Sequence, residues 1–475
     1  MDRSLLASLQ DAVAGPVAVG PEALESASRD ASAVRGRAEA VVRPADREDT
    51  VALVGWARSH RVALTARGGG TSLDGESVPV EGGVVVDFSG WTALGTVDLA
   101  ARTIRVGPGV VNRDLHETLR PSGLFFPPNP GSWHSCTVGG NIGTNASGPR
   151  SFRYGPTRRW LHAAELVLGT GELVDLGPST AKRSVGPELL EVIVGSEGTL
   201  GLVTSATLRL ARSPPRRCGI AVPVPTGAAV GSLANALARR VSLPLSALEF
   251  VDAAVAEALR GRPGARLPGG GGLILLELEA EGPDVESTAL SELEEVLRQS
   301  QIREAATVLP DADRMWSLRG EAGGVVATAT GPSVREDVAV PLDRIDRLIA
   351  VIGEIASEER VASHVYGHLG QGNLHPTFAV SPTTPAGRRI RSRILEASRA
   401  LGGTVSGEHG VGAVKRDYLP EELGPVATRL LGGWKALCDP DAILNPGKLL
   451  PEAAAPVPSP GRSPPDGEAG RTPGR

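Results

Sequence analysis

The stretch Arg67-Gly68-Gly69-Gly70-Thr71-Ser72 places three consecutive glycines ahead of two hydroxyl side chains. Two later stretches have a similar composition, Gly139-Gly140-Asn141-Ile142-Gly143-Thr144-Asn145 and Gly195-Ser196-Glu197-Gly198-Thr199-Leu200-Gly201. Glycine permits positive φ, and successive backbone N–H groups can then point into one concavity that holds phosphate oxygens. A tight turn explains any one of these stretches equally well. Three of them in one part of the chain favour a dinucleotide cofactor.

The glycine stretches do not have the spacing of the common nucleotide motifs. None fits G-x-G-x-x-G at the start of a crossover helix, which disfavours a Rossmann NAD site. The only Gly-Lys pair, Gly447-Lys448, is followed by Leu449 and not by serine or threonine, so a P-loop is excluded. The cofactor site must therefore belong to another class.

Composition narrows the class of protein. The chain has 475 residues, 41% hydrophobic residues and a net charge of −5, without a long basic run, which argues against nucleic acid as a partner. Cys136, Cys218 and Cys438 are far apart, which excludes a cysteine-based zinc or iron–sulfur module and fits a reducing cytoplasm. No secretory signal and no run of about 18 apolar residues is visible. We expect a cytoplasmic protein without a membrane span, a location that still allows peripheral attachment to a membrane.

The order of expected elements predicts an α+β fold. Residues 1–35 read as a helical lead-in, and residues 36–213 as short β-rich runs broken by glycines. Two prolines in Arg212–Arg217 mark a domain boundary, so that residues 214–450 form a second domain. Residues 451–475 contain seven prolines and are expected to be a disordered tail.

Several elements can be placed individually. Ala164–Leu176 reads as a hairpin that turns at Gly169-Thr170-Gly171, and Leu273–Leu278 reads as a strand. Asp343–Glu358 has its apolar residues on one helical stripe, and Arg388–Leu401 is a second helix, ended by two glycines.

Histidines are concentrated in the second domain, at His364, His368, His375 and His409. Imidazole is a common metal ligand and a common proton acceptor near neutral pH. His368, His375 and Glu408 form a plausible set of ligands for zinc or manganese, with positions left open for substrate. His409 adjoins Glu408 and could act as a base. For His364, a packed or surface histidine is the simpler interpretation.

A specific resemblance connects these features. Arg67–Ser72, Pro127-Pro128 ahead of Gly139-Gly140-Asn141, Tyr154-Gly155 and Gly195–Gly201 resemble the FAD-binding domain of the vanillyl-alcohol-oxidase superfamily. The resemblance is closest to the D-lactate dehydrogenase / glycolate oxidase FAD-subunit family. It continues through His368–His375, Ser406–Gly410 and Ile443–Lys448, and covers residues 36–450.

The resemblance implies a PCMH-type FAD-binding domain of two α/β subdomains over residues 36–213, and an FAD-linked oxidase cap domain over residues 214–450. It implies FAD-binding roles for Arg67, Gly68, Gly69, Gly70, Thr71, Ser72, Gly140, Asn141, Thr144, Asn145, Glu197, Gly198, Val203 and Asn445. No residue is an obvious attachment point, so we expect non-covalent FAD. His134 is the one candidate for attachment that has to be excluded.

The resemblance also implies an activity, the FAD-dependent oxidation of a D-2-hydroxy acid, D-lactate or glycolate first among them. His368, His375 and Glu408 would hold the cation, and His409 would take the hydroxyl proton. Arg319 and Arg335 match substrate-binding positions, in keeping with the planar donor pair that guanidinium offers to a carboxylate. Asn373 would shape the metal loop or contact the substrate. Taken without the family, each arginine reads as an ordinary surface charge.

The sequence departs from the family pattern near the expected substrate. Gln371 stands where aspartate is usual, Gly320 replaces a glutamate, Gly323 lies where some relatives carry a hydroxyl, and Trp133-His134 is unusual.

Three other functions stay open: a transferase resembling alkyl-glycerone-phosphate synthases, a non-catalytic flavin subunit of a larger oxidase and, last, a zinc hydrolase. The electron acceptor, a homodimer and a partner redox subunit are also left open.

Overall fold

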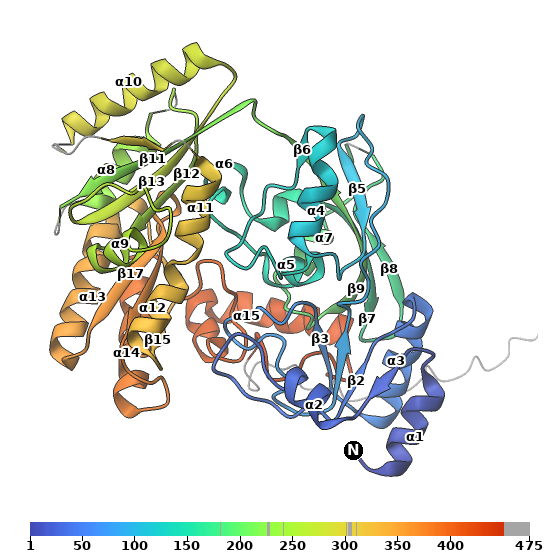
Figure 1. Ribbon diagram of the computed structural model, residues 1–475. Coiled ribbons are helices and arrows are strands. Elements are labelled where there is room, and N and C mark those ends of the chain that lie inside the picture. The colour runs from blue at the N-terminus through green and yellow to red at the C-terminus, as the bar shows by residue number, and fades with distance from the viewer. Residues whose placement is uncertain are drawn as a thin grey trace, which may run out of the picture.

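The computed structural model describes residues 1–180, 182–225, 229–240, 242–300, 302, 306–309 and 311–450. The tail expected to be disordered, residues 451–475, lies outside these described residues. Two lobes face each other in Figure 1, a first domain built on two small sheets and a cap built on one large sheet. None of the described helices is long and apolar enough to cross a bilayer.

The first subdomain is a four-stranded sheet with strand order β1-β2-β4-β3, in which β2, β4 and β3 are parallel. Its strands are β1 (Val17–Ala18), β2 (Ala40–Val42), β3 (Leu64–Arg67) and β4 (Val84–Asp87), and its helices are α1 (Arg3–Ala12), α2 (Pro21–Ala27) and α3 (Arg47–His60). Every residue of β4 is buried, as expected for a parallel strand covered on both faces. The Asp46 side chain caps α3 by accepting from the N–H of Asp49.

The second subdomain is an antiparallel sheet with strand order β5-β9-β7-β8. Its strands are β5 (Thr103–Val106), β7 (Leu161–Leu168), β8 (Leu173–Leu176) and β9 (Gly201–Arg209), and β6 (Leu124–Phe125) pairs with β10 (Ala211–Arg212) beside it. Its short helices are α4 (Asn112–Leu119), η1 (Arg120–Ser122), α5 (Val138–Thr144), α6 (Ser151–Tyr154), η2 (Thr157–Trp160) and α7 (Leu190–Ile193). The predicted hairpin over residues 164–176 is confirmed as β7 and β8.

The cap is a larger antiparallel sheet with strand order β14-β11-β13-β12-β17-β18-β15, and β16 also pairs with β18. Its strands are β11 (Arg216–Val224), β12 (Leu245–Val251), β13 (Gly272–Ala280), β14 (Thr307–Leu309), β15 (Val334–Arg335), β16 (Val338–Ala339), β17 (Ser363–His368) and β18 (Asn373–Phe378). Its helices are α8 (Val230–Ala238), α9 (Ala253–Arg260), α10 (Pro283–Gln299), α11 (Ala312–Gly320), α12 (Ala322–Thr330), η3 (Leu342–Arg344), α13 (Ile345–Glu359), η4 (Leu369–Gln371) and α14 (Pro385–Ala400).

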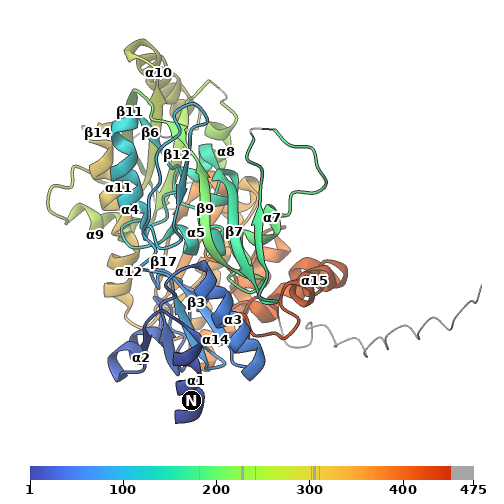
Figure 2. The same ribbon diagram turned by 90° about the vertical axis from the view of Figure 1, so that its right-hand side faces the viewer.

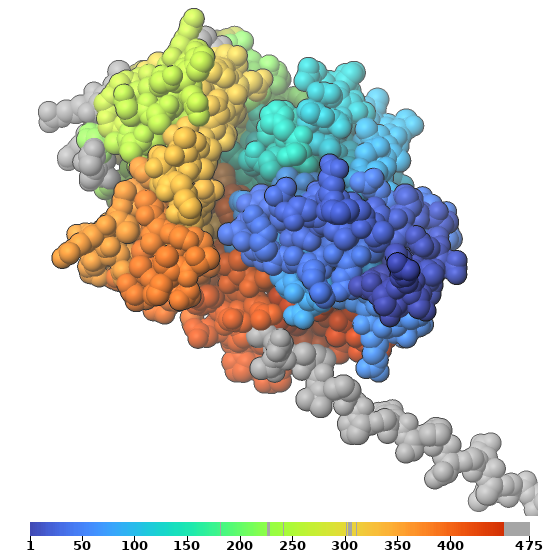
Figure 3. All heavy atoms as spheres, turned by 60° about the horizontal axis from the view of Figure 1, so that its bottom comes forward, coloured from blue at the N-terminus to red at the C-terminus, as the bar shows by residue number. Residues whose placement is uncertain are grey.

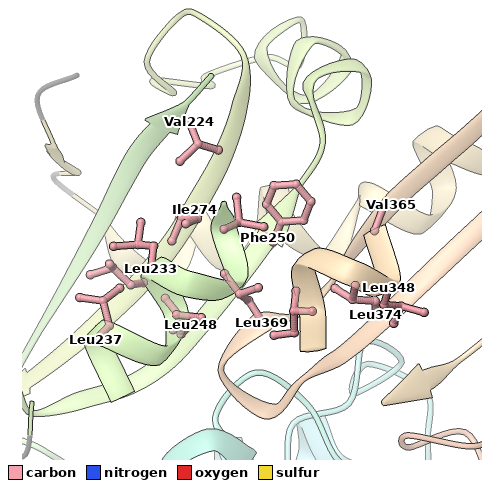
Figure 4. Packing of buried hydrophobic residues seen from close by; sticks show 14 of the residues in the cluster. Val224, Leu233, Leu237, Leu248, Phe250, Ile274, Leu348, Val365, Leu369 and Leu374 are labelled. Atoms are coloured by element: carbon pink, nitrogen blue, oxygen red, sulfur yellow. The ribbon is translucent and has the colours of Figure 1, made fainter. Parts of the chain in front are cut away.

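The cap confirms the strand and the two helices that the sequence predicts, and its antiparallel sheet covered by helices fits the α+β class. Helices α8 and α13 pack on one face of the sheet. Figure 4 shows Leu233 and Leu348 from these helices among strand residues such as Ile274 and Leu374. This core fixes strands β12, β17 and β18, which carry the site described below.

The end of the described chain returns to the first domain. After η5 (Arg416–Tyr418), helix α15 (Leu419–Cys438) kinks at Gly424, which has φ 74°, and Pro425. Leu444 then pairs in parallel with Leu64 and is fully buried in the core of the first subdomain. Figure 2 shows α15 beside the ends of β7 and β9, and Figure 3 shows the two lobes meeting along a furrow. The chain therefore links the two domains twice.

A cavity in the core of the cap should strongly lower the stability of the protein. Leu348→Ala in α13, where the side chain is fully buried, is expected to lower the free energy of unfolding by about 2–5 kcal/mol. The control Val285→Ala on α10, where the side chain is 47% exposed, should change it by only about 0.5 kcal/mol. Urea denaturation measures both changes, and equal losses in the two variants would contradict this description of the core.

Candidate active site

The three glycine stretches of the first domain meet at one cavity of about 1380 Å³ between the two domains. Close packing between the stretches depends on glycine. A Cβ on Gly68 would lie 2.1 Å from Oγ1 of Thr137, two residues before the second stretch. The second and third stretches are joined by the N–H of Glu197, which donates to the carbonyl of Gly143 at 2.8 Å. The cavity is larger than the roughly 300–1,000 Å³ of a drug-sized ligand's pocket, which suits an extended dinucleotide with a substrate beside it.

Most of the residues predicted to bind the cofactor line this cavity. On its wall lie Arg67, Gly68, Gly69, Gly70, Thr71, Ser72, Gly140, Asn141, Thr144, Glu197, Gly198 and Val203. Asn145 and Asn445 lie behind the wall. Oδ1 of Asn145 accepts from the N–H of Arg158 at 3.0 Å, while Nδ2 of Asn445 donates to the carbonyls of Glu76 and Glu197 at 2.8 and 2.6 Å. Asn445 therefore supports the loop that carries Glu197.

The histidines of the cap come together across a tight hairpin. Strands β17 and β18 are joined by η4 and Gly372, whose φ is 72°, and a Cβ added at Gly372 would collide with the carbonyl of Val340. In this hairpin Nε2 of His368 lies 2.8 Å from Oε1 of Glu408, and Nε2 of His375 lies 3.4 Å from the same oxygen. One ligand atom from each of these three residues fits within 4.8 Å of the others. The expected metal ligands are thus brought together.

The chemistry of this cluster fits a cation. Burial alone would lower the pKa of His368, but the carboxylates of Glu249 and Glu408 outweigh it and raise the pKa to about 10. Burial would raise the pKa of Glu408, yet His368 and His375 hold it well below its usual range. The second oxygen of Glu408 is buried without a hydrogen-bond partner among the described residues. The cluster therefore stabilises a positive charge and has a carboxylate oxygen free for it.

His409 completes the group on the cavity wall. Its ring stacks on that of His375, with the centroids 5.0 Å apart and an interplanar angle of 6°. Its Nε2 lies 3.8 Å from Oε1 of Glu408, and its side chain keeps 25% of its surface exposed. A base at this place can reach a molecule bound beside the His–Glu cluster.

Asp337 organises the cluster and was not identified from the sequence. It is fully buried, and its Oδ2 accepts from the backbone N–H groups of Glu408 and His409, both at 2.8 Å. Its Oδ1 accepts from Asn373 at 2.7 Å and lies 3.6 Å from Nδ1 of His375. Burial opposes its charge, but His409, Lys415 and His375 outweigh this and lower the pKa of Asp337. The one sequence signal was a pair of carboxylates, Glu336-Asp337, directly before an apolar strand.

The two arginines predicted to bind substrate occupy different environments. Arg319 is 7% exposed, lines the cavity, and has its guanidinium 5.1 Å from the centre of the Tyr366 ring. Arg335 is exposed, donates to Ser333 and lies off the wall that the cavity residues form. Asn373, buried against Asp337, lies beneath the cluster. Tyr366, which sequence reasoning missed, contacts both Arg319 and the ring of His375.

Of the positions at which the sequence departs from the family pattern, some line the cavity and one does not. Gly320, Gly323, Trp133 and His134 line the cavity, and the rings of Trp133 and His134 lie 3.9 Å apart. Gln371 is half-buried in η4, with its Oε1 lacking a hydrogen-bond partner among the described residues.

Comparison with known proteins gives two family matches. Residues 38–177 match the model of an FAD binding domain, and residues 213–449 match that of the C-terminal domain of FAD linked oxidases. Among curated proteins, the chain is 35% identical to D-lactate dehydrogenase of Archaeoglobus fulgidus over 86% of this chain and 91% of the relative. It is 31% identical to a glycolate oxidase subunit of Bacillus subtilis over 88% of this chain and 90% of the relative. It is 32% identical to D-2-hydroxyglutarate dehydrogenase of Stutzerimonas stutzeri over 86% of this chain and 90% of the relative.

A solved structure confirms the fold. p-Cresol methylhydroxylase superposes with a TM-score of 0.76 at 14% identity, over 94% of this chain and 97% of that one. The predicted arrangement of a PCMH-type FAD-binding domain followed by a cap is therefore confirmed, as is the resemblance from which it came. The chain belongs to the FAD-linked oxidases, a family of FAD-dependent oxidoreductases.

Proposed function

We propose that this protein oxidises a D-2-hydroxy acid to the 2-oxo acid with non-covalent FAD as the hydride acceptor, and that D-lactate and glycolate are the first candidate substrates. One observation carries the proposal: His368, His375, Glu408, His409 and Arg319 share a cavity wall with the three glycine stretches. A cation site, a base and a carboxylate-binding group thus face a cofactor site. The names of the relatives, which include D-lactate dehydrogenase and a glycolate oxidase subunit, support the same chemistry.

The glycine stretches would hold FAD, and His368, His375 and Glu408 would hold a divalent cation, zinc or manganese. When bound, FAD supplies a two-electron acceptor and the cation supplies a Lewis acid that lowers the pKa of a hydroxyl group. Arg319 offers its buried guanidinium to the substrate carboxylate and so fixes which face of the α-carbon is presented. His409 accepts the hydroxyl proton; its ring stacks on that of His375, and its backbone N–H donates to Asp337 and so holds the loop in place.

The transferase and non-catalytic alternatives are weaker for a structural reason. The likeness to alkyldihydroxyacetonephosphate synthase, at 17% identity, concerns the fold alone. A subunit without catalysis would have no need for a buried His–Glu cluster beside a base on the wall of the cofactor cavity.

The test is anaerobic mixing of the flavin-loaded protein with D- and L-2-hydroxy acids while the flavin absorbance is followed. Bleaching by a D-acid, with formation of the 2-oxo acid, is the expected result. A protein that binds no flavin, or a bound flavin that no hydroxy acid bleaches, would overturn the proposal.

His409→Ala should retain flavin and metal but reduce the flavin roughly 10²–10⁴-fold more slowly, because the hydroxyl proton loses its acceptor. Stopped-flow absorbance measures the rate. The control is His364→Ala, which removes a histidine 3.8 Å from Asp252 and outside the cavity wall, and it should reduce at the wild-type rate. Wild-type reduction by His409→Ala would eliminate His409 as the base.

Arg319→Met should raise the substrate concentration for half-maximal reduction roughly 10- to 100-fold, since a charge-assisted hydrogen bond contributes about 1.5–3 kcal/mol. Arg335→Met is the matched comparison, and it should have a smaller effect because Arg335 is exposed and off the cavity wall. Substrate titrations of the reduction rate measure both. If Arg335→Met has the larger effect, the assignment of the carboxylate to Arg319 is wrong.

Removal of the cation should leave the flavin bound and slow its reduction by roughly tenfold or more, because the hydroxyl then keeps its high pKa. Elemental analysis after chelation verifies the loss of metal, and added zinc or manganese should restore the rate. Metal-free protein that reduces at the full rate would contradict the cation's role.

A further inference from the structure

Glu249 lies on β12 beneath the site and is fully buried. Its two oxygens serve different partners: Oε1 lies 2.7 Å from Nδ1 of His368, and Oε2 lies 2.7 Å from Nη2 of Arg319. Both partners line the cavity, whereas Glu249 lies behind them. We propose that Glu249 is a positioning residue that couples substrate recognition to cation binding, by holding Arg319 and His368 in one fixed geometry. This inference rests on the proposed function.

A carboxylate is the group that both partners require. Arginine has only donors, so Arg319 needs an acceptor. Nε2 of His368 faces Glu408, so when that nitrogen gives its lone pair to a cation, Nδ1 carries the proton and also needs an acceptor. Glu249 presents one oxygen to each, Oε1 in a hydrogen bond with His368 and Oε2 in an ion pair with Arg319. A glutamine would provide one oxygen and one NH₂ group, and the NH₂ group would face a donor whichever way the amide is turned.

Arg319 retains donor capacity for a substrate while it is held in this way. Its Nη2 lies 2.7 Å from Oε2 of Glu249 as an ion pair that lacks hydrogen-bond geometry, and both Nε and Nη2 are buried without a hydrogen-bond partner among the described residues. The Tyr366 ring lies 5.1 Å from the guanidinium and 5.2 Å from the His375 ring. Arg319 is therefore connected to the His–Glu cluster twice, through Glu249 and through Tyr366. A displacement of Arg319 would therefore also displace the histidines, and a displacement of the histidines would displace Arg319.

A buried ion pair can also serve mainly to join elements of the fold, and Glu277 on the neighbouring strand β13 offers a comparison. It too is fully buried, and its partners are Arg150, Arg217 and Trp316. These contacts tie the first domain to the cap without involving the His–Glu cluster. Glu249 differs because each of its oxygens contacts a group with a separate role in the proposed reaction. A structural role predicts only a loss of stability, whereas the positioning role predicts two linked losses of affinity.

The experiment uses Glu249→Gln in the full-length, flavin-containing protein and measures binding instead of turnover. Zinc affinity, by competition with a chromophoric chelator, reports on His368. Oxalate affinity at saturating zinc, from the change in flavin absorbance, reports on Arg319. We expect zinc affinity to fall roughly 10- to 100-fold, as for other changes behind metal ligands, and oxalate affinity to fall roughly tenfold or more.

Glu165→Gln is the matched control, because Glu165 is a buried carboxylate that pairs with Arg47 and accepts from Thr204 far from the site. Both of its affinities should stay within about twofold of wild type. If Glu249→Gln loses its flavin, Glu249→Asp replaces it, since this variant keeps the charge but is too short by one methylene to reach both partners. Glu249→Asp should weaken the affinities for zinc and oxalate, but by less than the falls expected for Glu249→Gln.

Unchanged affinities in the variant that keeps its flavin would overturn the inference, and so would a fall in only one of them. Loss of flavin from both variants would also overturn it, by showing that Glu249 is needed for the fold. The proposed function fails on different evidence, namely wild-type flavin that no D-2-hydroxy acid bleaches. The two failures are therefore distinguishable.

Discussion

Two buried carboxylates, one from each domain, hold the loop that carries the candidate base. Asp337 of the cap accepts the N–H groups of Glu408 and His409, both at 2.8 Å. Glu197 of the first domain accepts from the N–H groups of Val411 at 2.6 Å and Gly412 at 2.9 Å, which follow His409 after Gly410. Buried carboxyl groups need donors, and a hydrogen bond to a charged carboxylate such as that of Asp337 contributes about 1.5–3 kcal/mol. The position of His409 relative to the cofactor cavity depends on these four bonds.

Glycine makes this double attachment sterically feasible. A Cβ on Gly407 would lie 1.9 Å from Nδ2 of Asn373, and Gly410 has φ 97° with Glu197 and Glu76 at the place of a side chain. The loop can therefore approach both carboxylates only with glycine at these positions. The return of the chain to the first domain, where Leu444 pairs with Leu64, anchors the far side of the same connection. The cavity is thus closed by elements distant in the sequence.

The sequence identified the parts of the site whose chemistry is local. The glycine stretches, the His368/His375 pair and the Glu408-His409 pair are each visible because their informative residues stand within a few positions of one another, and the structure brings them to one cavity. The pairing of β7 with β8 was predictable for the same reason, since two β-rich runs stand on either side of a short glycine-containing turn.

The residues that sequence reasoning missed act over long separations. Asp337 contacts backbone groups 71 and 72 positions away, and Glu249 contacts a histidine 119 positions away. A single carboxylate within a strand, as Glu249, or between two strands, as Asp337, has no local sequence pattern that indicates such contacts. For the same reason the sequence could not separate Arg319, which is buried on the cavity wall, from Arg335, which is exposed off it. Asn445 matched a cofactor motif, yet its side chain supports the backbone of Glu76 and Glu197.

We propose that the cap presents a cation, through two imidazoles and a carboxylate, to the cofactor cavity. X-ray absorption at the zinc edge of zinc-loaded, flavin-containing protein tests it most directly. The account predicts two imidazole nitrogens at roughly 2.0–2.1 Å together with carboxylate oxygen, and the loss of one imidazole in His375→Ala. A spectrum without imidazole scattering, or one unchanged in His375→Ala, would contradict it.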